Sequence, residues 1–364
     1  MNLDNKKVYI AGAHSRGITM GYYLQYLYPE LEIEAYLYNN DEINPSDVNG
    51  VPVLKISADS KLDTELPVYL GMRGVNHYAI IETLIACGVE KIIPVDVNLD
   101  LEIRNQFLKK YYFDVGRVYT KIDDYVIPKD LKTREYDKAK VYVACSVFDK
   151  ALQTPYGLGD YEKKIQVGTA LTDVRLDNAV YDNEGENISD RNKQYCELTG
   201  LYWVWKHATE DYVGLCHYRR HFLLPDNWNS YMEKNDIDVI LPVPLYVFPN
   251  LADNFRGRHA AKEWDCMMHY LKGHLPTDYE NATDFFKGNL YSPCNMLIAK
   301  REVLDQLCTW MFPILDAVVD ICGMEEQAYN NRYPGFLSER LITYFFETKR
   351  DCYKVVYADK NFLP

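Results

Sequence analysis

Short apolar runs and longer amphipathic stretches alternate along the first third of the chain. Four apolar runs that end in turn residues predict strands at 8–11, 33–38, 68–71 and 91–95. The stretches between them predict helices at about 17–27, 76–87 and 102–112. Strands that alternate with helices are typical of a parallel sheet covered on its faces by helices. We therefore expect an α/β domain, Rossmann-like, over residues 1–126.

The first predicted strand runs into a turn with the sequence GAHSRG at residues 12–17. In a doubly wound domain this turn lies where the start of a helix accepts a phosphate. Gly12, His14 and Gly17 are therefore candidate cofactor-binding residues. The full GxGxxG spacing is absent and no GK[ST] follows, so the alternative is that the glycines only form a tight turn. In pattern this domain resembles the small Rossmann-like domains that precede bacterial sugar-modifying enzymes.

Residues 127–138 interrupt this alternation. They are charged, hold few apolar side chains and include Pro128, which predicts a linker. The run KVYVAC at 140–145 then predicts a new strand, and with it the start of a second α/β domain over residues 139–364.

Composition narrows the classes of protein that fit. A length of 364 residues suits two domains, and a net charge of −13 argues against a general nucleic-acid binder. The nine cysteines form no CxxC pair and are expected as buried thiols. No apolar run approaches the roughly 18 residues of a membrane span, and the first residues lack the pattern of a signal peptide. We expect a cytoplasmic protein.

Polar side chains are densest between residues 182 and 220. A polar loop leads into the stretch NKQYCELTGLYWVWK at 192–206, which predicts one helix capped by Ser189 or Asp190. The candidate substrate-binding residues of this segment are Asn187, Ser189, Asn192, Tyr195, Glu197 and Thr199.

A predicted strand at 211–216 ends in His217, Tyr218, Arg219 and Arg220. Two arginines at the carboxyl end of a parallel strand suit a diphosphate, because a guanidinium matches phosphate with two parallel hydrogen bonds. The alternative is a structural ion pair with a carboxylate. Adjacent residues that leave a strand point opposite ways, so we expect one arginine to face a ligand and the other to brace the fold.

Four motifs in order carry a resemblance to a known family. They are NISDRN with YCELTGLYWVWK, then DYVGLCHYRRHF, NLYSPCNMLIAKREV and GFLSERL. Over about residues 140–360 the chain resembles the capsular and exopolysaccharide glycosyltransferases long catalogued only as a domain of unknown function. The resemblance implies a GT-A-like second domain that moves galactose, galactofuranose or glucose from a UDP-sugar. The implied acceptor is a saccharide or lipid-linked molecule, with peripheral membrane association through the acceptor and no nucleic-acid partner.

Glycosyl transfer needs a group that stabilises the departing diphosphate. Many GT-A enzymes use Asp-x-Asp with a divalent metal, but Asp236 and Asp238 precede the apolar run 239–242 and so lie at the wrong end of a strand. Two explanations remain open. Either protein cations, with Arg219 and Arg220 as candidates, replace the metal, or His217 and a distant carboxylate bind Mn²⁺ or Mg²⁺. No metal ligand is assigned.

An inverting enzyme also needs a base for the acceptor hydroxyl. The best candidate is Glu339, in a polar group that is expected to open a helix near residue 336. The alternative is that Glu339 offsets the helix dipole or pairs with Arg340. Tyr218, Asn295, in an expected strand at 292–298, and Arg340 complete the candidate substrate-binding set. Residues 248–259 are expected to form an irregular loop, either a lid or a solvated surface.

A second class of function competes with catalysis. Because the metal motif is absent, the chain also fits a non-catalytic nucleotide-sugar-binding or scaffolding subunit of a polysaccharide assembly. An NAD-dependent enzyme fits less well, since no Tyr-x-x-x-Lys pair accompanies a full glycine fingerprint.

Overall fold

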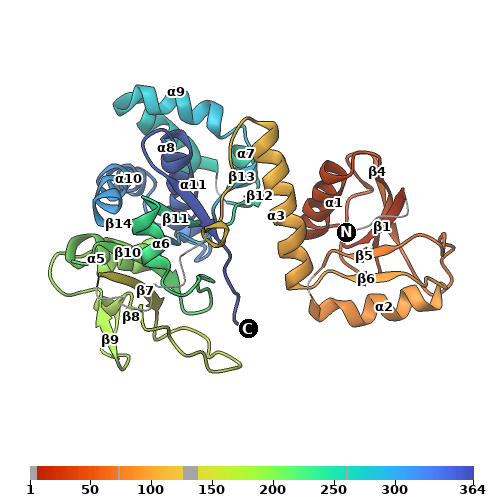
Figure 1. The fold of residues 1–364 in the computed structure, drawn as a ribbon, viewed down its shortest axis with the longest axis horizontal. Helices are drawn as coiled ribbons and strands as arrows, with labels where there is room; N and C mark the ends of the chain where they lie inside the picture. Colours follow the sequence, from red (N-terminus) through yellow and green to blue (C-terminus); the bar gives the residue numbers. More distant parts are fainter. Residues whose placement is uncertain (1–5, 73, 126–137, 260) are drawn as a thin grey trace. The chain divides into compact units, whose positions relative to one another are not determined.

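The computed structural model describes residues 6–72, 74–125, 138–259 and 261–364. The chain forms two compact units, Met1–Tyr119 and Thr120–Pro364, each built around its own sheet (Figure 1). The α/β fold class predicted from the sequence is confirmed.

The expected linker at 127–138 lies, except for Lys138, outside the described residues. The six residues before it, 120–125, belong to the second unit. Ile122 is fully buried in the core of that unit, and Tyr357 N donates to Thr120 O at 3.0 Å. The structure therefore places the start of the second unit ahead of the position expected from the sequence.

The first unit has a six-stranded sheet in the order β3-β4-β2-β1-β5-β6. All neighbouring pairs are parallel except β3 with β4. The strands are β1 Lys7–Ala11, β2 Glu32–Tyr38, β3 Asp47–Val48, β4 Val51–Lys55, β5 Val68–Leu70 and β6 Ile92–Pro94, and the helices are α1 Ser15–Leu27, α2 His77–Ala86 and α3 Val97–Asp114. Every strand and helix expected here is present, while β3 and β4 were not foreseen.

Helices cover both faces of the first sheet. Tyr9 and Ala11 of β1 share a core with Ile80 of α2. On the other face α1 packs against α3, where the rings of Tyr23 and Phe107 stack at 4.4 Å between centroids. Every side chain of β1 after Lys7 is buried, as expected for a strand that helices cover on both faces.

The turn after β1 is tight enough to account for its glycines by packing alone. Gly12 has φ +110°, and a Cβ on Gly17 would lie 2.0 Å from Gly12 O. His14 lies on the surface beside Glu42, with 3.0 Å between Nε2 and Oε2. Ligand binding by Gly12, His14 and Gly17 stays a prediction.

The second unit has a seven-stranded sheet in the order β15-β11-β14-β10-β7-β8-β9. Only β14 runs antiparallel to its neighbours among these described strands. The strands are β7 Ala139–Cys145, β8 Glu162–Gln166, β9 Ala179–Tyr181, β10 Tyr212–His217, β11 Val239–Pro242, β14 Leu297–Lys300 and β15 Val355–Ala358, with a separate small sheet of β12 Leu245–Tyr246 and β13 Leu290–Tyr291.

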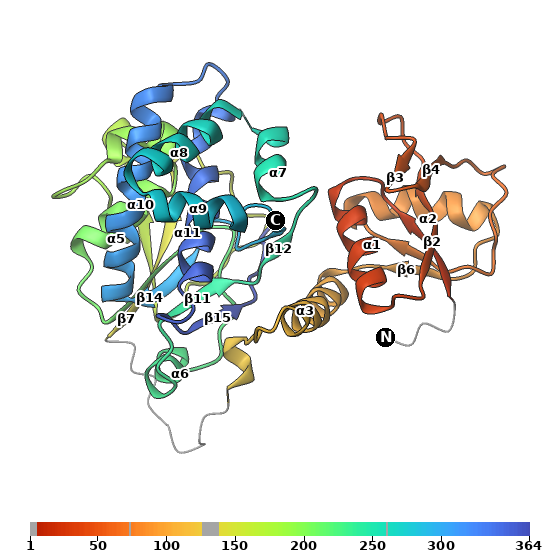
Figure 2. The ribbon, with the colours of Figure 1, turned by 90° about the horizontal axis from the view of Figure 1, so that it is seen from above.

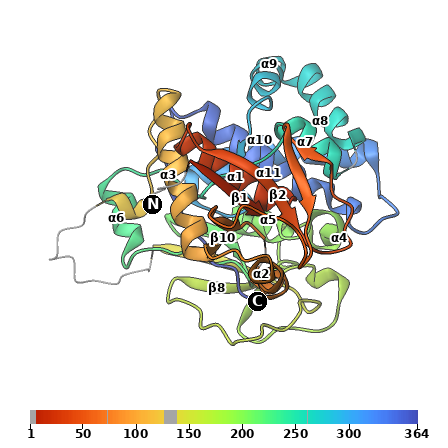
Figure 3. The same cartoon turned by 90° about the vertical axis from the view of Figure 1, so that its right-hand side faces the viewer.

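Helices again lie on both faces. The helices are α4 Asn192–Tyr195, α5 Leu198–His207, α6 Trp228–Lys234, α7 Leu251–Arg258, α8 Ala261–His274, α9 Pro276–Phe285, α10 Arg301–Cys322 and α11 Tyr333–Thr348. Trp228 and Met232 of α6 are buried against one face of the sheet, and α5 and α10 pack on the other (Figure 2). Helices α7, α8 and α9 form a group beside α10 and α11 (Figure 3). Among the described residues, no helix has the length and apolar character needed to cross a membrane.

Two segments expected as continuous elements are broken by residues with positive φ. The helix expected at 192–206 breaks at Cys196, which has φ 50° and ψ −127°, so that α4 ends before it and α5 begins at Leu198. The strand expected at 292–298 begins only at Leu297, because Cys294 and Asn295 have φ values of 80° and 50°. Both expectations were wrong at these points. Residues other than glycine rarely adopt a positive φ unless tertiary contacts enforce it, and a local sequence pattern does not show such contacts.

Two further expectations are corrected. Helix α11 begins at Tyr333 with Pro334 in its first turn, where the missing N–H is not needed, so Glu339 lies inside the helix and does not open it. Residues 251–258 form helix α7 where an irregular loop was expected, and Asn250 Oδ1 caps it by accepting from Asp253 N at 2.8 Å.

Candidate active site at the carboxyl edge of the second sheet

Several polar segments meet at one edge of the second sheet. His217 ends β10, and Lys360 follows the end of β15, which runs parallel to β11. Because β14 runs antiparallel to β10, the turn at Cys294 and Asn295 that precedes β14 lies at this same edge. Open α/β sheets bind ligands beyond the carboxyl ends of their strands, so we take this edge as the candidate site.

Asn295 connects three segments of this edge. Its side chain is 3% exposed. Nδ2 donates to Glu197 Oε1 at 2.8 Å and to Gly335 O at 2.9 Å, and Oδ1 accepts from Ser338 Oγ at 2.6 Å. Glu197 is half-buried, and its Oε2 accepts no hydrogen bond from the described residues. Asn295 is therefore fully occupied, while Glu197 keeps one oxygen open.

Glu339 is held at both oxygens. Oε1 accepts from Cys294 N at 2.6 Å, and Oε2 accepts from Arg340 Nη1 at 2.8 Å. Arg340 is 2% exposed and lies over the ring of Tyr291 at 4.3 Å. Burial raises the pKa of Glu339, against the opposing effects of Arg340 and of Cys294 N. The ion pair with Arg340, which was the alternative interpretation of Glu339 in the sequence, is thus present.

His217 is bound to the same turn. Its Nε2 lies 2.5 Å from Cys294 O, and since a carbonyl oxygen only accepts, Nε2 carries the proton. Burial lowers the pKa of His217, which favours the neutral ring. Nε2 is therefore not free to bind a metal ion.

The two arginines after β10 diverge. Arg220 lies over the ring of Phe362 at 5.2 Å, and its charge acts on His217, Cys294 and Glu339. Arg219 extends towards the carbonyl oxygens of residues 150 and 151 at 3.5 and 3.4 Å, and its Nε is buried without a hydrogen-bond partner among the described residues. Arg220 is thus the arginine on the side of Glu339 and His217.

Two further cations at this edge were missed by the sequence analysis. Arg332 Nε donates to Cys196 Sγ at 3.0 Å, and its charge acts on Glu197. The charge of Lys360 acts on Cys294. Neither residue lies in a motif that the sequence singled out. Together with Arg220 they gather positive charge in a chain whose net charge is −13.

Two other predicted substrate-binding residues, Ser189 and Thr199, belong to a buried hydrogen-bond network at the start of α5. Asp182 is fully buried and accepts from Ser189 Oγ at 2.5 Å and Thr199 Oγ1 at 2.6 Å. The same carboxylate accepts from Gly168 N at 2.8 Å and Thr169 N at 3.0 Å. The two hydroxyls therefore hold the chain around Asp182, and the structure does not bring them to Glu339.

The remaining predicted residues also serve local contacts. Asn192 Nδ2 donates to the carbonyl of Cys196 at 2.7 Å, and Asn187 Nδ2 to the carbonyl of residue 185 at 2.7 Å. Tyr195 is fully buried, and its hydroxyl donates to Asp316. Tyr218 is half-buried beneath Arg219, with 5.3 Å from the guanidinium to the ring centre. Their contact with a substrate stays a prediction.

The donors at this edge fit a divalent cation poorly. Mn²⁺ and Mg²⁺ prefer several oxygen ligands, whereas here both Glu339 oxygens are bonded, His217 Nε2 is protonated and Glu197 offers a single open oxygen. The charges of Arg220, Arg332 and Lys360 also act on this edge. Asp236 and Asp238 lie before β11 and both pair with Lys300, the second at 2.7 Å.

A group of possible metal ligands lies elsewhere in the described part of the chain. It consists of Glu162, Cys216 and His221, all buried. His221 Nδ1 lies 2.7 Å from Glu162 Oε1, and Glu162 Oε2 accepts from Gly159 N at 2.8 Å. These groups satisfy one another without an ion.

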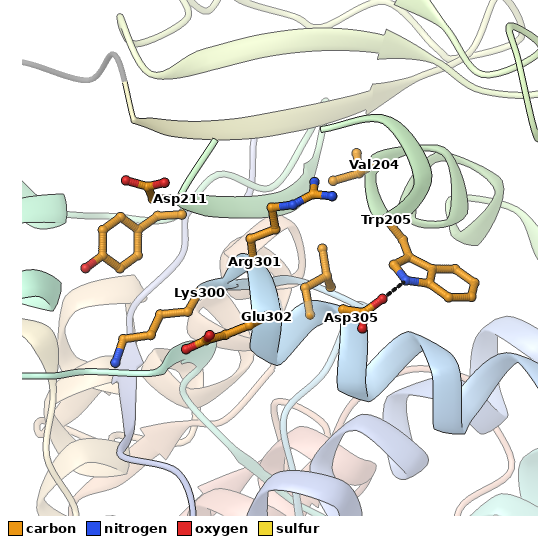
Figure 4. A pocket seen from close by; sticks show the side chains of 9 residues that line it. Val204, Trp205, Asp211, Lys300, Arg301, Glu302 and Asp305 are labelled. Atoms are coloured by element: carbon orange, nitrogen blue, oxygen red, sulfur yellow. Dashed lines mark hydrogen bonds between the residues drawn. The ribbon is translucent and has the colours of Figure 1, made fainter. Parts of the chain in front are cut away.

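A cavity of about 570 Å³ lies at the opposite edge of the second sheet. It is bounded by the amino end of β10 at Tyr212, the carboxyl end of β14 at Lys300 and the start of α10 (Figure 4). Trp205 Nε1 donates to Asp305 Oδ1 at 2.8 Å at one side of the cavity. The cavity is therefore separate from the candidate site at His217.

Comparison with known protein families gives a match to most of the second unit. A family model described as "Domain of unknown function (DUF4422)" matches residues 140–350. The chain belongs to this family. A comparison with curated proteins finds no match.

Among solved structures, this member of the family is similar to the WbbM bifunctional glycosyltransferase in its apo form. The two are 23% identical with a TM-score of 0.55, over 62% of this chain and 45% of that chain. The chain thus spans less than half of the length of that protein, and the likeness shows the fold alone. The mannosyltransferase Ktr4p from S. cerevisiae also matches, at 13% identity and a TM-score of 0.25 over 67% of this chain and 72% of that chain, which is too distant to carry an argument.

Proposed function

We propose that the chain is a GT-A-type glycosyltransferase that moves a hexose from a UDP-sugar to a saccharide or lipid-linked acceptor. The reaction would belong to capsular, exopolysaccharide or O-antigen synthesis. The observation that carries the proposal is the group of cations and carboxylates at the carboxyl edge of the second sheet. The likeness in fold to a bifunctional glycosyltransferase supports it.

The cations suit the departing diphosphate. When the bond from the anomeric carbon to the diphosphate breaks, negative charge grows on the leaving oxygen, and fixed positive charge stabilises it. Arg220, Arg332 and Lys360 are near enough to this edge to act on its titratable groups. Protein cations then take the part that a divalent metal takes in many GT-A enzymes.

The carboxylates suit the acceptor. Glu197 and Glu339 act on each other electrostatically and are tied to successive residues of one turn, Asn295 and Cys294. A carboxylate at this place can take the proton of a hydroxyl group as that group attacks the anomeric carbon.

A panel of nucleotide sugars tests the proposal on the full chain. We expect a UDP-hexose to raise the melting temperature, since a ligand at 100 times its dissociation constant stabilises a protein by about 2.7 kcal/mol. We also expect slow release of UDP without an acceptor, unchanged by EDTA. Arg301→Gln serves as a control, because Arg301 is exposed in the cavity at the opposite edge and should change neither result.

Three outcomes contradict parts of this proposal. Stabilisation without any turnover, with or without saccharide acceptors, supports a non-catalytic nucleotide-sugar-binding subunit. Loss of turnover in EDTA with recovery in Mn²⁺ rules out the replacement of the metal by cations. No response to any nucleotide sugar rejects the function as a whole.

A further inference from the structure

We propose that Glu197 is the base that accepts the proton of the acceptor hydroxyl, and that Glu339 is a positioning residue. This inference rests on the proposed glycosyl transfer. It reverses the roles expected from the sequence, where Glu339 was the candidate base and Glu197 a substrate-binding residue.

Both oxygens of Glu339 accept hydrogen bonds that stabilise the fold. Oε1 accepts from Cys294 N at 2.6 Å and Oε2 from Arg340 Nη1 at 2.8 Å. Arg340 is 2% exposed, so a Glu339 side chain that turned towards a substrate would leave a buried guanidinium without its carboxylate partner. Glu339 therefore holds the turn at Cys294 in place.

Glu197 has the opposite arrangement. One oxygen is oriented by Asn295 Nδ2 at 2.8 Å, while Oε2 accepts no hydrogen bond from the described residues. The carboxylate precedes α5 but does not cap it. Asn295 is itself fixed by its hydrogen bonds with Gly335 O and Ser338 Oγ. The Glu197 carboxylate that it binds therefore has a defined orientation, and so does Oε2.

The backbone on both sides of this contact is strained. The described residues include seven non-glycine residues with positive φ, and three of them are Cys196, Cys294 and Asn295. Cys196 directly precedes Glu197, and the other two form the turn that binds both carboxylates. Such conformations persist only where surrounding contacts enforce them, and they gather at functional sites.

In the proposed transfer step, the groups at this edge account for the proton and for the leaving group. The proton of the acceptor hydroxyl passes to Glu197 Oε2 as the acceptor oxygen forms its bond to the anomeric carbon. The bond from that carbon to the diphosphate oxygen breaks, and its electron pair leaves with the diphosphate. Arg220 and Arg332 offset the charge of the leaving group.

Glu197→Gln in the full chain tests the role directly. The amide oxygen of glutamine still accepts from Asn295 Nδ2, but the side chain can no longer take a proton. We expect the kcat of transfer to fall at least about 100-fold, with the Kd for UDP and the melting temperature unchanged. In Glu197→Ala, added formate should restore part of the lost rate.

Glu339→Gln is the matched comparison. Its amide group cannot accept from both Cys294 N and Arg340, so we expect a lower melting temperature, with a smaller loss of kcat than in E197Q. E197Q that transfers within about threefold of wild type overturns the inference, because a residue that only holds Asn295 would survive this change. E197Q that loses UDP binding together with turnover also overturns it. A wild-type chain that turns over no nucleotide sugar rejects the proposed function itself, whatever the variants do.

Discussion

At the scale of single residues, the partner of each charged side chain decides what that side chain is free to do. Arg219 and Arg220 are neighbours in sequence, yet Arg219 reaches backbone carbonyls, whereas the charge of Arg220 acts on Glu339 and His217. Glu339 is bonded at both oxygens, and Glu197 at one. Chemical type alone does not separate the members of either pair.

Replacing each arginine by lysine should therefore give two different variants. Arg220→Lys should keep the melting temperature but weaken UDP binding and transfer, because a point charge does not reproduce a bidentate fork. The loss of transition-state stabilisation should be about 2 to 4 kcal/mol, measured as kcat/KM. Arg219→Lys should instead lower the free energy of unfolding by about 1 kcal/mol through its contacts with two carbonyls. Two variants with wild-type UDP binding would move the diphosphate site elsewhere.

His259 gives a prediction about pH. Its ring stacks on Phe336 at 3.9 Å, and burial, with help from Arg340 and Arg258, lowers its pKa from 6.5 to about 4. Between pH 6.5 and pH 4, His259 binds a proton in the unfolded chain but not in the folded chain. The free energy of unfolding therefore decreases as the pH falls from 6.5 towards 4. His259→Phe keeps a ring on Phe336 and should show a smaller drop in melting temperature between pH 7 and pH 5 than wild type. Equal drops would contradict the assignment.

At the scale of elements, the sequence predicts the strands and helices that a local apolar pattern determines. It misses the breaks that depend on contacts between side chains and the backbone. Strands β1, β7 and β10 follow apolar runs and lie where expected. The break at Cys196 is supported by the Asn192 side chain, which binds the Cys196 carbonyl, and no periodicity reports such a contact. Motifs indicated five residues that meet at the site, namely Glu197, His217, Arg220, Asn295 and Glu339. Arg332 and Lys360 join them only through the topology of the sheet and of α11.

The strain at this helix break can be measured with a pair of variants. Cys196→Gly and Cys196→Ala both remove the thiol that binds Arg332, but only alanine keeps a Cβ at φ 50°. Relief of strain favours glycine by about 1 to 3 kcal/mol, and the freedom that glycine gives the unfolded chain opposes it by up to about 1 kcal/mol. We expect C196G to be more stable than C196A by about 1 kcal/mol in urea unfolding. If C196G is less stable than C196A by about 1 kcal/mol, the break carries no strain, because only the freedom of glycine in the unfolded chain then remains.

At the scale of the whole molecule, each unit has its own sheet and its own buried core. The charged stretch at 127–138 predicted a boundary, because charge and proline are typical of linkers. The sequence does not show that the residues before this stretch pack on β15, more than 200 positions later in the chain. Ile122 is fully buried in the core of the second unit, and Lys121 forms an ion pair with Asp359.

Two fragments of the second unit should therefore differ in stability. A fragment of residues 120–364 should fold alone, because it holds all of the core around β15. A fragment of residues 139–364, cut at the boundary expected from the sequence, lacks Ile122 and leaves Asp359, 9% exposed, without Lys121. Loss of a buried isoleucine side chain costs about 2 to 5 kcal/mol, so the shorter fragment should unfold at a clearly lower urea concentration. Ile122→Ala within residues 120–364 should reproduce much of this loss while the chain length stays constant. If both fragments unfold at the same urea concentration, residues 120–125 are not part of the core of the second unit.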